Sequence, residues 1–477
     1  MQRLIISGLS GGSGKTIVSL GLTRFFTNQQ YTVFPFKKGP DYIDATWLMH
    51  ATHKPCYCLD PYFLNDQELY THFYQCIQNA PQNALAIIEG NRGIFDGKDE
   101  LGSCSTAQVA HILDCPILLT INCAKMTRTT AAILMGIQNF DPQLKITGVI
   151  LNNIASKRHG SIIQKSIETY TDIPVLGIIP RQIKNPIPER HMGLSLQDYN
   201  NKEQILNNLA KIIAENTDTT QILKSMENSP LKEPTFSFPA IQKKQKVNIA
   251  YIYDDAIWFY YQENLDALKE HGATLYPLSL LSEKSFDEQL LEKNISLKNI
   301  HALYIGGGYP ELFAKEISQS PKLQQIKSLA ENNLPIYAEC GGFMLCSKAI
   351  HTLTNGQYER YPMIGIFDIE TKFQTKPQGL GYTEAKTINQ NPYHSLNLVW
   401  KGHEFHFSTA INYQEQQKFI LELTKGHGMV KKQKAFDGVL YKNCYASYMH
   451  LYAPATPHWA KNFTTLANTY KENINGK

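Results

Sequence analysis

One stretch near the N-terminus decides the fold of the first half of the chain: Gly8-Leu9-Ser10-Gly11-Gly12-Ser13-Gly14-Lys15-Thr16. It follows an apolar run at Leu4–Ser7, and the segment after it, Ile17–Phe26, has the apolar spacing of a helix. Glycines let backbone N–H groups turn toward phosphate oxygens, the lysine adds a positive charge, and the threonine offers a hydroxyl to Mg²⁺. The order strand, glycine-rich loop, helix therefore predicts a P-loop.

The loop residues are the candidate ATP ligands. Five residues separate Gly8 from Gly14, one more than in the strict Walker pattern. This longer loop resembles that of dethiobiotin synthetase and of the partition ATPases. The partition ATPases have a signature lysine where this chain has Ser10, which favours small-molecule chemistry over a dimerising ATP switch. We expect ATP to be bound by Gly11, Gly12, Ser13, Gly14, Lys15 and Thr16.

Short apolar runs alternate with longer mixed segments through the first half of the chain. The runs are rich in Ile, Val and Leu, as in strands buried on both faces of a sheet, and helical spacers between them predict a parallel α/β sheet. The segment Glu203–Lys224 has the spacing of a helix that closes this domain. The predicted strands are Leu4–Ser7, Thr32–Phe36, Leu85–Glu89, Pro116–Asn122, Ile146–Asn152 and Val175–Ile179.

A change of composition divides the chain into two parts. Prolines recur in residues 226–246, and this segment ends in a lysine-rich run. Such a composition is typical of a linker. A second α/β pattern begins at Val247. We therefore predict an α/β protein with an N-terminal domain at 1–225, a linker at 226–246 and a second domain at 247–477.

Length and composition exclude several classes of protein. Of the 477 residues, 43% are hydrophobic and 18% are charged, so a packed core is expected. The net charge of +4 is too small to indicate nucleic-acid binding, and no apolar run reaches the ~18 residues of a membrane helix. The nine cysteines are scattered, and the N-terminus has no signal-peptide pattern. We expect a cytoplasmic protein without nucleic-acid or membrane partners.

Carboxylates follow two of the predicted strands. Asp41 and Asp44 lie shortly after the second strand, Glu89 ends the third, and Asp96 lies a few residues further on. Carboxyl ends of parallel strands meet at the edge where such sheets bind ligands, and Mg²⁺ prefers hard oxygen ligands. Any one of these residues alone is as well explained as a helix cap or turn residue. Beside a P-loop, their combination predicts a metal and substrate site.

The second half contains a candidate nucleophile. Pro335–Glu339 is an apolar strand pattern that runs into Cys340-Gly341-Gly342 and then into a helical segment. This arrangement resembles a nucleophile elbow, in which the helix N-terminus is expected to lower the pKa of the cysteine thiol. Backbone N–H groups of Gly341, and of Gly307 and Gly308 after another strand, are candidates for an oxyanion hole.

A cysteine nucleophile requires a base, and His450 near the C-terminus is the candidate. Class I glutamine amidotransferases place their histidine there, and the second domain resembles that flavodoxin-like α/β class. These enzymes usually add a glutamate two residues after the histidine, but this chain has Tyr452. The third member of the triad is therefore missing or replaced.

A P-loop amidoligase joined to a class I amidotransferase resembles the cobyrinate a,c-diamide synthases of cobalamin biosynthesis. The resemblance covers nearly the whole chain. After Glu89-Gly90 the family usually has small or hydrophobic residues, whereas this chain has Asn91-Arg92. The motifs that carry the resemblance are Phe36–Asp44, Glu89–Gly97, Ser105–Ala107, Pro188–Leu194, Gly306–Leu312, Glu339–Gly342 and Gly402–Ser408.

The resemblance implies an activity and a set of roles. It implies a ligase that uses ATP, Mg²⁺ and L-glutamine to amidate cobyrinic acid, as a possible homodimer. Cys340 and His450 would be catalytic, and Thr16, Asp44 and Glu89 would hold the metal. Asp41, Asp96 and Lys37 would contact the substrate, and Asn152 would read the nucleotide base or cap a turn. Arg190 and His191 are further candidates for the corrin and are equally well explained as solvated loop residues. We interpret His403 and His406 as structural or domain-interface residues.

Two alternatives stay open at this point. The first keeps the chemistry and changes the macrocycle to hydrogenobyrinate or nickel-sirohydrochlorin, because the carboxylates are placed alike on all three rings. The second is a non-catalytic P-loop switch protein with a relic amidotransferase domain. Ser10 and the intact pair of Cys340 and His450 argue against this second alternative, whereas Tyr452 leaves room for it.

Overall fold

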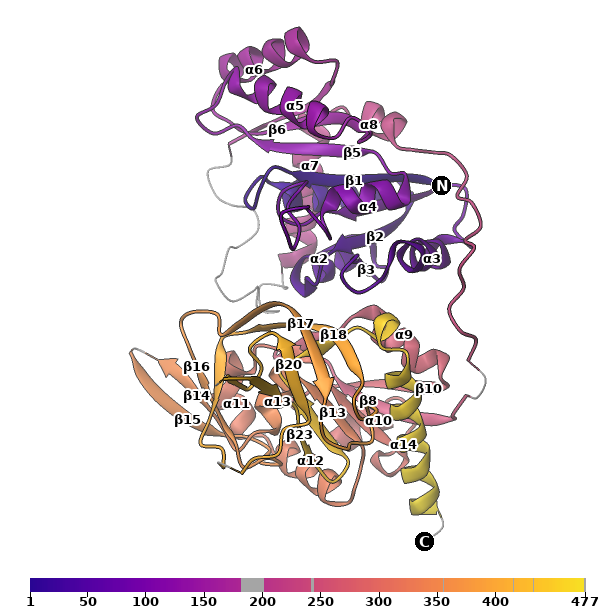
Figure 1. Cartoon of the computed structure of the whole chain (residues 1–477), viewed down its shortest axis with the longest axis vertical. Helices are drawn as coiled ribbons and strands as arrows, with labels where there is room; N and C mark the ends of the chain where they lie inside the picture. Colours follow the sequence, from indigo (N-terminus) through magenta and orange to yellow (C-terminus); the bar gives the residue numbers. More distant parts are fainter. Residues whose placement is uncertain (182–200, 242–243, 355, 415, 432, 476–477) are drawn as a thin grey trace. The chain divides into compact units, whose positions relative to one another are not determined.

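The computed structural model describes residues 1–181, 201–241, 244–354, 356–414, 416–431 and 433–475. The chain forms two compact units, Met1–Phe238 and Pro239–Lys477, which are coloured indigo to magenta and magenta to yellow in Figure 1. Both units combine helices with sheets, so the predicted α/β class is confirmed. The boundary between them lies inside the predicted linker.

The first unit is built on a sheet of seven parallel strands in the order β3-β2-β4-β1-β5-β6-β7. Every predicted strand of this half is present, and among the described residues the sequence pattern missed the short β3. The central strands are almost completely buried, which explains their unbroken apolar sequences. The strands are β1 (Gln2–Gly8), β2 (Thr32–Lys38), β3 (Tyr57–Leu59), β4 (Ala84–Glu89), β5 (Ile117–Asn122), β6 (Ile146–Ile154) and β7 (Val175–Pro180).

Helices connect these strands and cover the sheet. The segment predicted as one helix over 203–224 forms two, because Asp218 accepts a hydrogen bond from the Gln221 amide and starts a new helix there. Between the two helices, Thr217 pairs with Gly177 beside β7. The helices of the first unit are α1 (Lys15–Asn28), α2 (Tyr42–Thr52), α3 (Asp66–Ile77), α4 (Thr106–Leu113), α5 (Thr129–Phe140), α6 (Lys157–Tyr170), α7 (Lys202–Asn216) and α8 (Thr219–Ser225).

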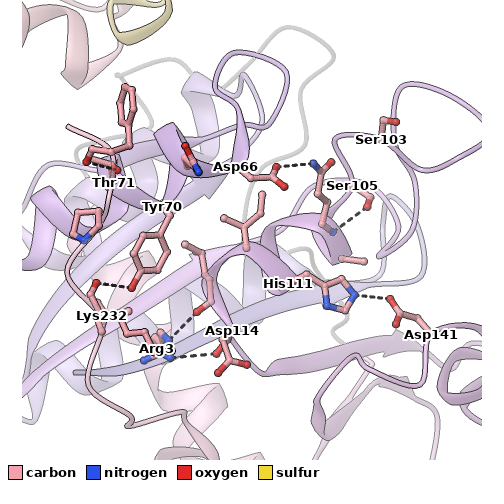
Figure 2. A pocket seen from close by; sticks show the side chains of 18 of the residues that line it. Arg3, Asp66, Tyr70, Thr71, Ser103, Ser105, His111, Asp114, Asp141 and Lys232 are labelled. Atoms are coloured by element: carbon pink, nitrogen blue, oxygen red, sulfur yellow. Dashed lines mark hydrogen bonds and ion pairs between the residues drawn. The ribbon is translucent and has the colours of Figure 1, made fainter. Parts of the chain in front are cut away.

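The chain after α8 stays attached to the first unit instead of forming a free tether. The Arg3 guanidinium donates to the Ser229 carbonyl at 3.0 Å, and the Tyr70 hydroxyl donates to the Lys232 carbonyl at 2.8 Å. Figure 2 shows the contact of Tyr70 with Lys232, which lies at a pocket of about 1020 Å³ lined by this segment, α3 and α4. The first half of the predicted linker is therefore part of the N-terminal unit.

The second unit contains a six-stranded sheet in the order β10-β8-β11-β13-β24-β23, parallel except at the β23 edge. Numbered from β8, its parallel strands have the flavodoxin-like order 2-1-3-4-5. This order agrees with the amidotransferase-type domain that the sequence predicts. The strands are β8 (Val247–Ile252), β10 (Ala273–Leu278), β11 (Ala302–Ile305), β13 (Ile336–Glu339), β23 (Val439–Tyr441) and β24 (Cys444–Ser447).

Three further sheets complete this unit. A two-stranded sheet pairs β9 (Ile257–Phe259) with β12 (Gly307–Gly308). A four-stranded sheet contains β14 (Ala349–Thr354), β15 (Gln357–Pro362), β16 (Glu370–Phe373) and β19 (Ser408–Ile411). A six-stranded sheet contains β17 (Gly379–Thr387), β18 (Val399–His406), β20 (Leu421–Lys425), β21 (Val430–Lys431), β22 (Ala435–Asp437) and β25 (His450–Leu451).

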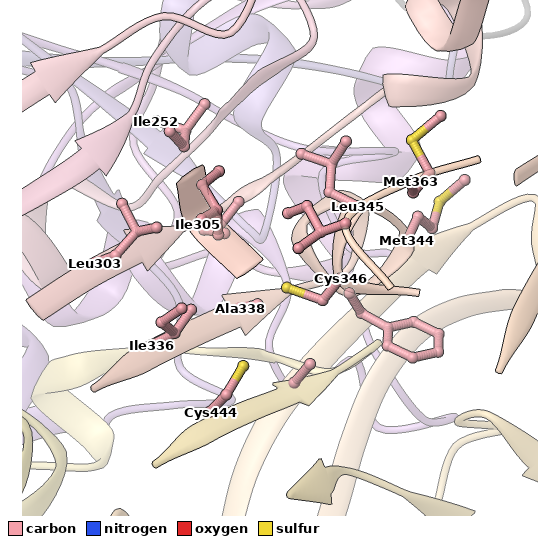
Figure 3. Close-up of a cluster of buried hydrophobic side chains, with 14 of the residues drawn as sticks. Ile252, Leu303, Ile305, Ile336, Ala338, Met344, Leu345, Cys346, Met363 and Cys444 are labelled. Carbon is pink, nitrogen blue, oxygen red and sulfur yellow. The ribbon is translucent and has the colours of Figure 1, made fainter. Parts of the chain in front are cut away.

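Helices of the second unit pack on its parallel sheet, and α13 follows β13 directly. Beneath α13 lies a cluster of buried apolar side chains that includes Ile305, Ala338 and Leu345 (Figure 3). Within the described residues, no helix is both long and apolar enough to span a membrane. The helices are α9 (Gln262–Glu270), α10 (Phe286–Leu291), α11 (Ala314–Ser318), α12 (Lys322–Glu331), α13 (Gly341–Cys346) and α14 (His458–Asn475), with 3-10 turns at Leu297–Asn299, Pro310–Phe313 and Ala453–Ala455.

Candidate functional site

The P-loop connects β1 to α1, as predicted, and its own polar groups hold its shape. The Lys15 ammonium donates to the Ser10 carbonyl at 2.8 Å, and the Ser13 hydroxyl donates to the same carbonyl at 2.8 Å. Gly12 and Gly14 have positive φ angles of 73° and 97°. The loop is therefore curled around its lysine, in the form in which a phosphate group would replace the Ser10 carbonyl as the partner of Lys15.

Asn152 braces this loop from the end of β6. Its side-chain amide donates to the Ser13 carbonyl at 3.1 Å, and the residue is buried. A Cβ added at Gly14 would lie only 2.1 Å from the Asn152 Nδ2 atom, so the two residues are in close contact. Asn152 thus meets the loop backbone, whereas the next residue, Asn153, lines a pocket of about 730 Å³ that also includes Lys125 and Arg181.

Carboxylates gather beside the P-loop around the ammonium of Lys37. The Lys37 Nζ atom lies 2.6 Å from Asp44 Oδ2, 3.2 Å from Glu89 Oε1 and 3.8 Å from Asp41 Oδ2. The Thr16 hydroxyl donates to Glu89 Oε1 at 2.8 Å. The fold therefore brings together the three metal candidates, Thr16, Asp44 and Glu89, at the carboxyl ends of β2 and β4.

Lys37 has a different environment from the one expected for a substrate-binding residue. Its side chain is only 3% exposed and is enclosed by Asp44 and Glu89. Burial lowers the pKa of Lys37, but the carboxylates of Asp44, Glu89 and Asp41 outweigh burial and raise it above its ordinary value. Lys37 is therefore a cation that neutralises its neighbours, and its contact with the corrin stays a prediction.

Burial sets the protonation of the remaining groups in this cluster. It raises the pKa of Glu89, against the opposing effect of Lys37. Burial also lowers the pKa of Lys15, with Lys37 as the second cause. Burial thus disfavours the charged forms of Glu89 and Lys15, and a cation bound beside Glu89 would favour its ionised form.

This arrangement fits a magnesium ion. The Glu89 Oε2 atom is buried without a hydrogen-bond partner, although the Oε1 atom of the same carboxylate has two neighbours. Glu89, Asp44 and the Thr16 hydroxyl supply the hard oxygen atoms that Mg²⁺ prefers. Among the described residues, no group of three or more His, Cys, Asp or Glu side chains is placed to hold a metal ion.

Asp41 and Asp96 occupy two different positions at the rim of this cluster. Asp41 caps α2, and its Oδ1 atom accepts from the amides of Ile43 and Asp44 at 3.0 and 3.1 Å. Asp96 is exposed and accepts from the Gly93 amide at 2.8 Å, in the loop that follows β4. Capping thus engages one oxygen of Asp41, and contact of either carboxylate with a substrate stays a prediction.

Arg92, which departs from the family pattern, is exposed in the same loop with a φ of 52°. Arg190 and His191 lie outside the described residues.

The second site is centred on Cys340, on the turn between β13 and α13. Its φ of 50° and ψ of −104° are strained for a residue with a side chain, as in a nucleophile elbow. The Cys340 amide donates to the Ser447 carbonyl at 2.7 Å, and the thiol lies 3.5 Å from the Phe405 carbonyl. The residue is 2% exposed, so the thiol is enclosed by protein.

The expectation that the helix N-terminus lowers the pKa of Cys340 was wrong. Burial raises the pKa of this thiol above its ordinary value, and the nearby Glu311 carboxylate raises it further. The hydrogen bond with the Gly341 backbone acts in the opposite direction but is weaker. Cys340 is therefore a neutral thiol at rest and requires a base to take its proton when it attacks.

His450 lies against the predicted oxyanion residues. A Cβ added at Gly307 would lie 2.4 Å from the His450 Cε1 atom and 3.2 Å from Nε2. A Cβ added at Gly341 would lie 2.9 Å from the Gly308 amide nitrogen. The fold thus brings Cys340, His450, Gly307, Gly308 and Gly341 together, with the imidazole edge packed on the glycine strand β12.

Three buried residues around His450 carry no strong signal in the sequence. The Asp437 carboxylate accepts from the amides of Tyr448 and Met449, at 3.0 and 2.9 Å, and shapes the turn before His450. The His403 ring stacks on the His450 ring, with 4.8 Å between the ring centroids. The two residues stack because they are opposite each other where β18 pairs with β25. Glu339, directly before the nucleophile, lies 3.6 Å from His450.

His406, in contrast, has the structural role that we expected. It stacks on Tyr448 at 3.8 Å, and its Nδ1 atom lies 2.8 Å from the Ser408 carbonyl.

Comparison with known families agrees with this division into two sites. Residues 4–194 match the CobQ/CobB/MinD/ParA nucleotide binding domain. Residues 248–457 match the CobB/CobQ-like glutamine amidotransferase domain. The P-loop cluster and the pair of Cys340 and His450 each lie inside one of these matches.

Full-length relatives share this domain order. Proteins named cobyrinate a,c-diamide synthase from Caldanaerobacter subterraneus subsp. tengcongensis and Magnetococcus marinus are 36% and 35% identical, over 94% and 96% of both chains. A protein of the same name from Archaeoglobus fulgidus is 32% identical over 98% of both chains. Similarity of this extent includes both sites and the segment between them, and the chain belongs to the cobyrinate a,c-diamide synthase family.

Proposed function

We propose that this protein amidates the a and c acetate side chains of cobyrinic acid, with glutamine as the nitrogen donor and ATP as the energy source. The observation that carries the proposal is the full-length similarity to relatives named for this reaction, with both sites assembled in this chain. A carboxylate is a poor electrophile, so amide formation requires its activation. The two sites supply the two reactants of the final step, an activated carboxyl group and ammonia.

The Cys340 site supplies the ammonia. The thiol proton moves to His450 as sulfur attacks the γ-carbonyl carbon of glutamine, and backbone amides of the glycine strand stabilise the oxyanion. The C–N bond breaks, the amide nitrogen takes the proton from His450 and leaves as ammonia, and a thioester remains on Cys340. Water then hydrolyses the thioester to glutamate and regenerates the thiol.

The P-loop site activates the carboxylate. One oxygen of the acetate side chain attacks the γ-phosphorus of ATP, and ADP leaves with the electrons of the broken P–O bond. The loop amides and Lys15 neutralise charge on the phosphoryl oxygens during this transfer. Ammonia then attacks the carbonyl carbon of the acyl phosphate, loses a proton, and displaces phosphate to form the amide.

Magnesium would be held by Asp44, Glu89 and the Thr16 hydroxyl, and it would supply charge neutralisation at the phosphates of ATP. Lys37 holds the two carboxylates together before the ion arrives. Asp41 and Asp96 lie at the rim, where the acetate side chain would meet them. We expect the reaction to take place in the cytoplasm, and a homodimer stays a prediction that light scattering on the purified protein would check.

The proposal is tested by mass spectrometry of the product. The purified protein is incubated with MgATP, glutamine labelled with ¹⁵N in the side-chain amide, and cobyrinic acid. Parallel reactions contain hydrogenobyrinic acid or nickel-sirohydrochlorin. We expect two labelled amides on cobyrinic acid and little product on the other two macrocycles.

Two variants serve as controls. Cys340→Ala should lose the label from glutamine and recover amidation with ammonium chloride, because only the ammonia source is removed. Lys15→Ala should lose amidation from both nitrogen sources. Preferred amidation of another macrocycle would overturn the proposed substrate but not the proposed chemistry. A protein that does not hydrolyse glutamine would overturn the amidotransferase function.

A further inference from the structure

The usual partner of the catalytic histidine is absent from its usual position. Two residues after His450 stands Tyr452, whose hydroxyl donates to Glu263 Oε1 at 3.3 Å. The Tyr452 ring also packs edge-on against Tyr261, with 5.0 Å between centroids. These contacts direct Tyr452 into the packing around α9.

We propose that Glu339, the residue directly before the nucleophile, is the acid that orients His450 for proton transfer. Its Oε2 atom lies 3.6 Å from the His450 Nδ1 atom. The inference rests on the proposed glutaminase function and assigns one positioning residue within it. The acid would then come from the end of β13 instead of from the strand that carries the histidine.

Both oxygens of the Glu339 carboxylate are held in place. Oε1 accepts from the Leu451 backbone amide at 3.1 Å, and Oε2 accepts from the Tyr304 hydroxyl at 3.0 Å. The side chain is 1% exposed, so water does not compete for these contacts. A carboxylate fixed in this way presents Oε2 to His450 in one orientation.

The imidazole is constrained on its other sides as well. Its Cε1–Nε2 edge packs against Gly307 of β12, and the His403 ring stacks on its face with an interplanar angle of 16°. Burial keeps the pKa of His403 well below its ordinary value, so this neighbour stays uncharged. Of these three described neighbours of the ring, Gly307, His403 and Glu339, it is the Glu339 carboxylate that can pair with a positive charge on His450.

This orientation has a chemical consequence. A carboxylate facing Nδ1 favours the tautomer with its proton on Nδ1, which leaves the Nε2 lone pair free to take the thiol proton. When that proton arrives, the same carboxylate stabilises the imidazolium. Because burial makes Cys340 a weak acid, the enzyme depends on this stabilisation more than an enzyme with a preformed thiolate.

If Glu339 had a purely structural role, Glu339→Gln would hydrolyse glutamine at the native rate. The Leu451 amide needs only an acceptor at Oε1, and the Gln side chain in Glu339→Gln retains one. The new amide group would, however, donate toward Nδ1 and favour the opposite tautomer of His450. Glu339→Gln therefore keeps the backbone anchor and removes the orienting charge.

The test measures glutamine hydrolysis and ammonium-dependent amidation in the full-length protein. We expect Glu339→Gln to lower kcat for glutamine hydrolysis by about 10²- to 10³-fold, with KM changed less than about threefold and ammonium-dependent amidation retained. Tyr452→Phe is the matched control. Its kcat should stay within about threefold of the native value, which corresponds to a change in activation free energy below about 1 kcal/mol. Melting temperatures of both variants report on folding.

A second measurement does not depend on the variant being folded. Proton NMR of the native protein should show an imidazole N–H resonance from Nδ1 that is lost in His450→Gln. Unchanged kcat in folded Glu339→Gln, a large loss in Tyr452→Phe, or absence of this resonance would overturn the assignment. A native protein that hydrolyses no glutamine would instead overturn the proposed function on which it rests.

Discussion

Gly307→Ala is the most direct perturbation of the glutaminase site. The added Cβ would lie 2.4 Å from the His450 Cε1 atom. Non-bonded carbon atoms approach to about 3.5–4.0 Å, so the ring has to retreat by roughly 1.1–1.6 Å. The backbone on either side of His450 is held, because the Met449 amide donates to Asp437 and the Leu451 amide donates to Glu339. The imidazole therefore has to change its own orientation instead of moving with its strand.

A misplacement of about 1 Å costs on the order of 10²-fold in rate. We expect Gly307→Ala to lower kcat/KM for glutamine hydrolysis by at least about 100-fold on that basis. Overpacking costs about 1–3 kcal/mol, which in a domain of this size lowers Tm by about 2–4 °C for each kcal/mol. Amidation with ammonium should continue, because the P-loop site is untouched.

The assay couples glutamate release to a dehydrogenase and runs beside differential scanning calorimetry. Gly136→Ala is the control, since this exposed position in α5 has no atom within 4 Å of an added Cβ. It should leave both activities unchanged and raise the stability of the helix slightly. Native glutaminase activity in folded Gly307→Ala would refute the packing of His450 on the glycine strand.

Three more predictions concern the other contacts. Asn152→Ala removes the brace on the Ser13 carbonyl, so the KM for ATP in ammonium-dependent amidation should rise by about 3- to 10-fold, while an unchanged KM would contradict the contact. Lys37→Met leaves the buried carboxylates without their cation, at a cost of about 3–5 kcal/mol, so the Tm of the variant should fall. MgCl₂ should then raise the Tm of the variant more than that of the native protein. If MgCl₂ and EDTA shift the Tm of both proteins equally, the result would argue against a shared cation site. The hydrogen bond from Arg360 lowers the pKa of Glu370 to about 2, so this carboxylate stabilises the fold above its unfolded pKa and loses that effect as pH falls through the range from about 4.5 to 2. The difference in unfolding free energy between the native protein and Glu370→Gln should therefore narrow on acidification in urea titrations, and a constant difference would count against the bond.

Much of the fold follows from local sequence. Buried parallel strands require unbroken apolar runs, and the P-loop requires glycines followed by Lys and Thr, so both are visible without an alignment. The elbow at Cys340 is visible for the same reason, because small residues have to follow a strand at a sharp turn. The division of 203–224 into α7 and α8 was missed, although Asp218 is a favoured residue at the start of a helix.

The protonation of the two sites and the partners of their residues depend on tertiary structure. From the sequence, only a substrate contact is predicted for Lys37, whereas the pairing of β2 with β4 encloses this residue between Asp44 and Glu89. Cys340 stands at a helix N-terminus, yet burial outweighs the helix and raises its pKa. Burial and distance are properties of segments far apart in the chain, so no local pattern reports them.

Local sequence patterns are enough to identify the chemical groups of this protein: a phosphate loop, a set of carboxylates, a cysteine on an elbow and a histidine after it. Each of these is a local pattern of residue types that its chemistry requires. The acid that lies beside His450, in contrast, depends on the tertiary fold. The tyrosine at the usual position turns toward Glu263, and β13 brings Glu339 to the imidazole, because contacts between distant strands depend on how the sheet is assembled.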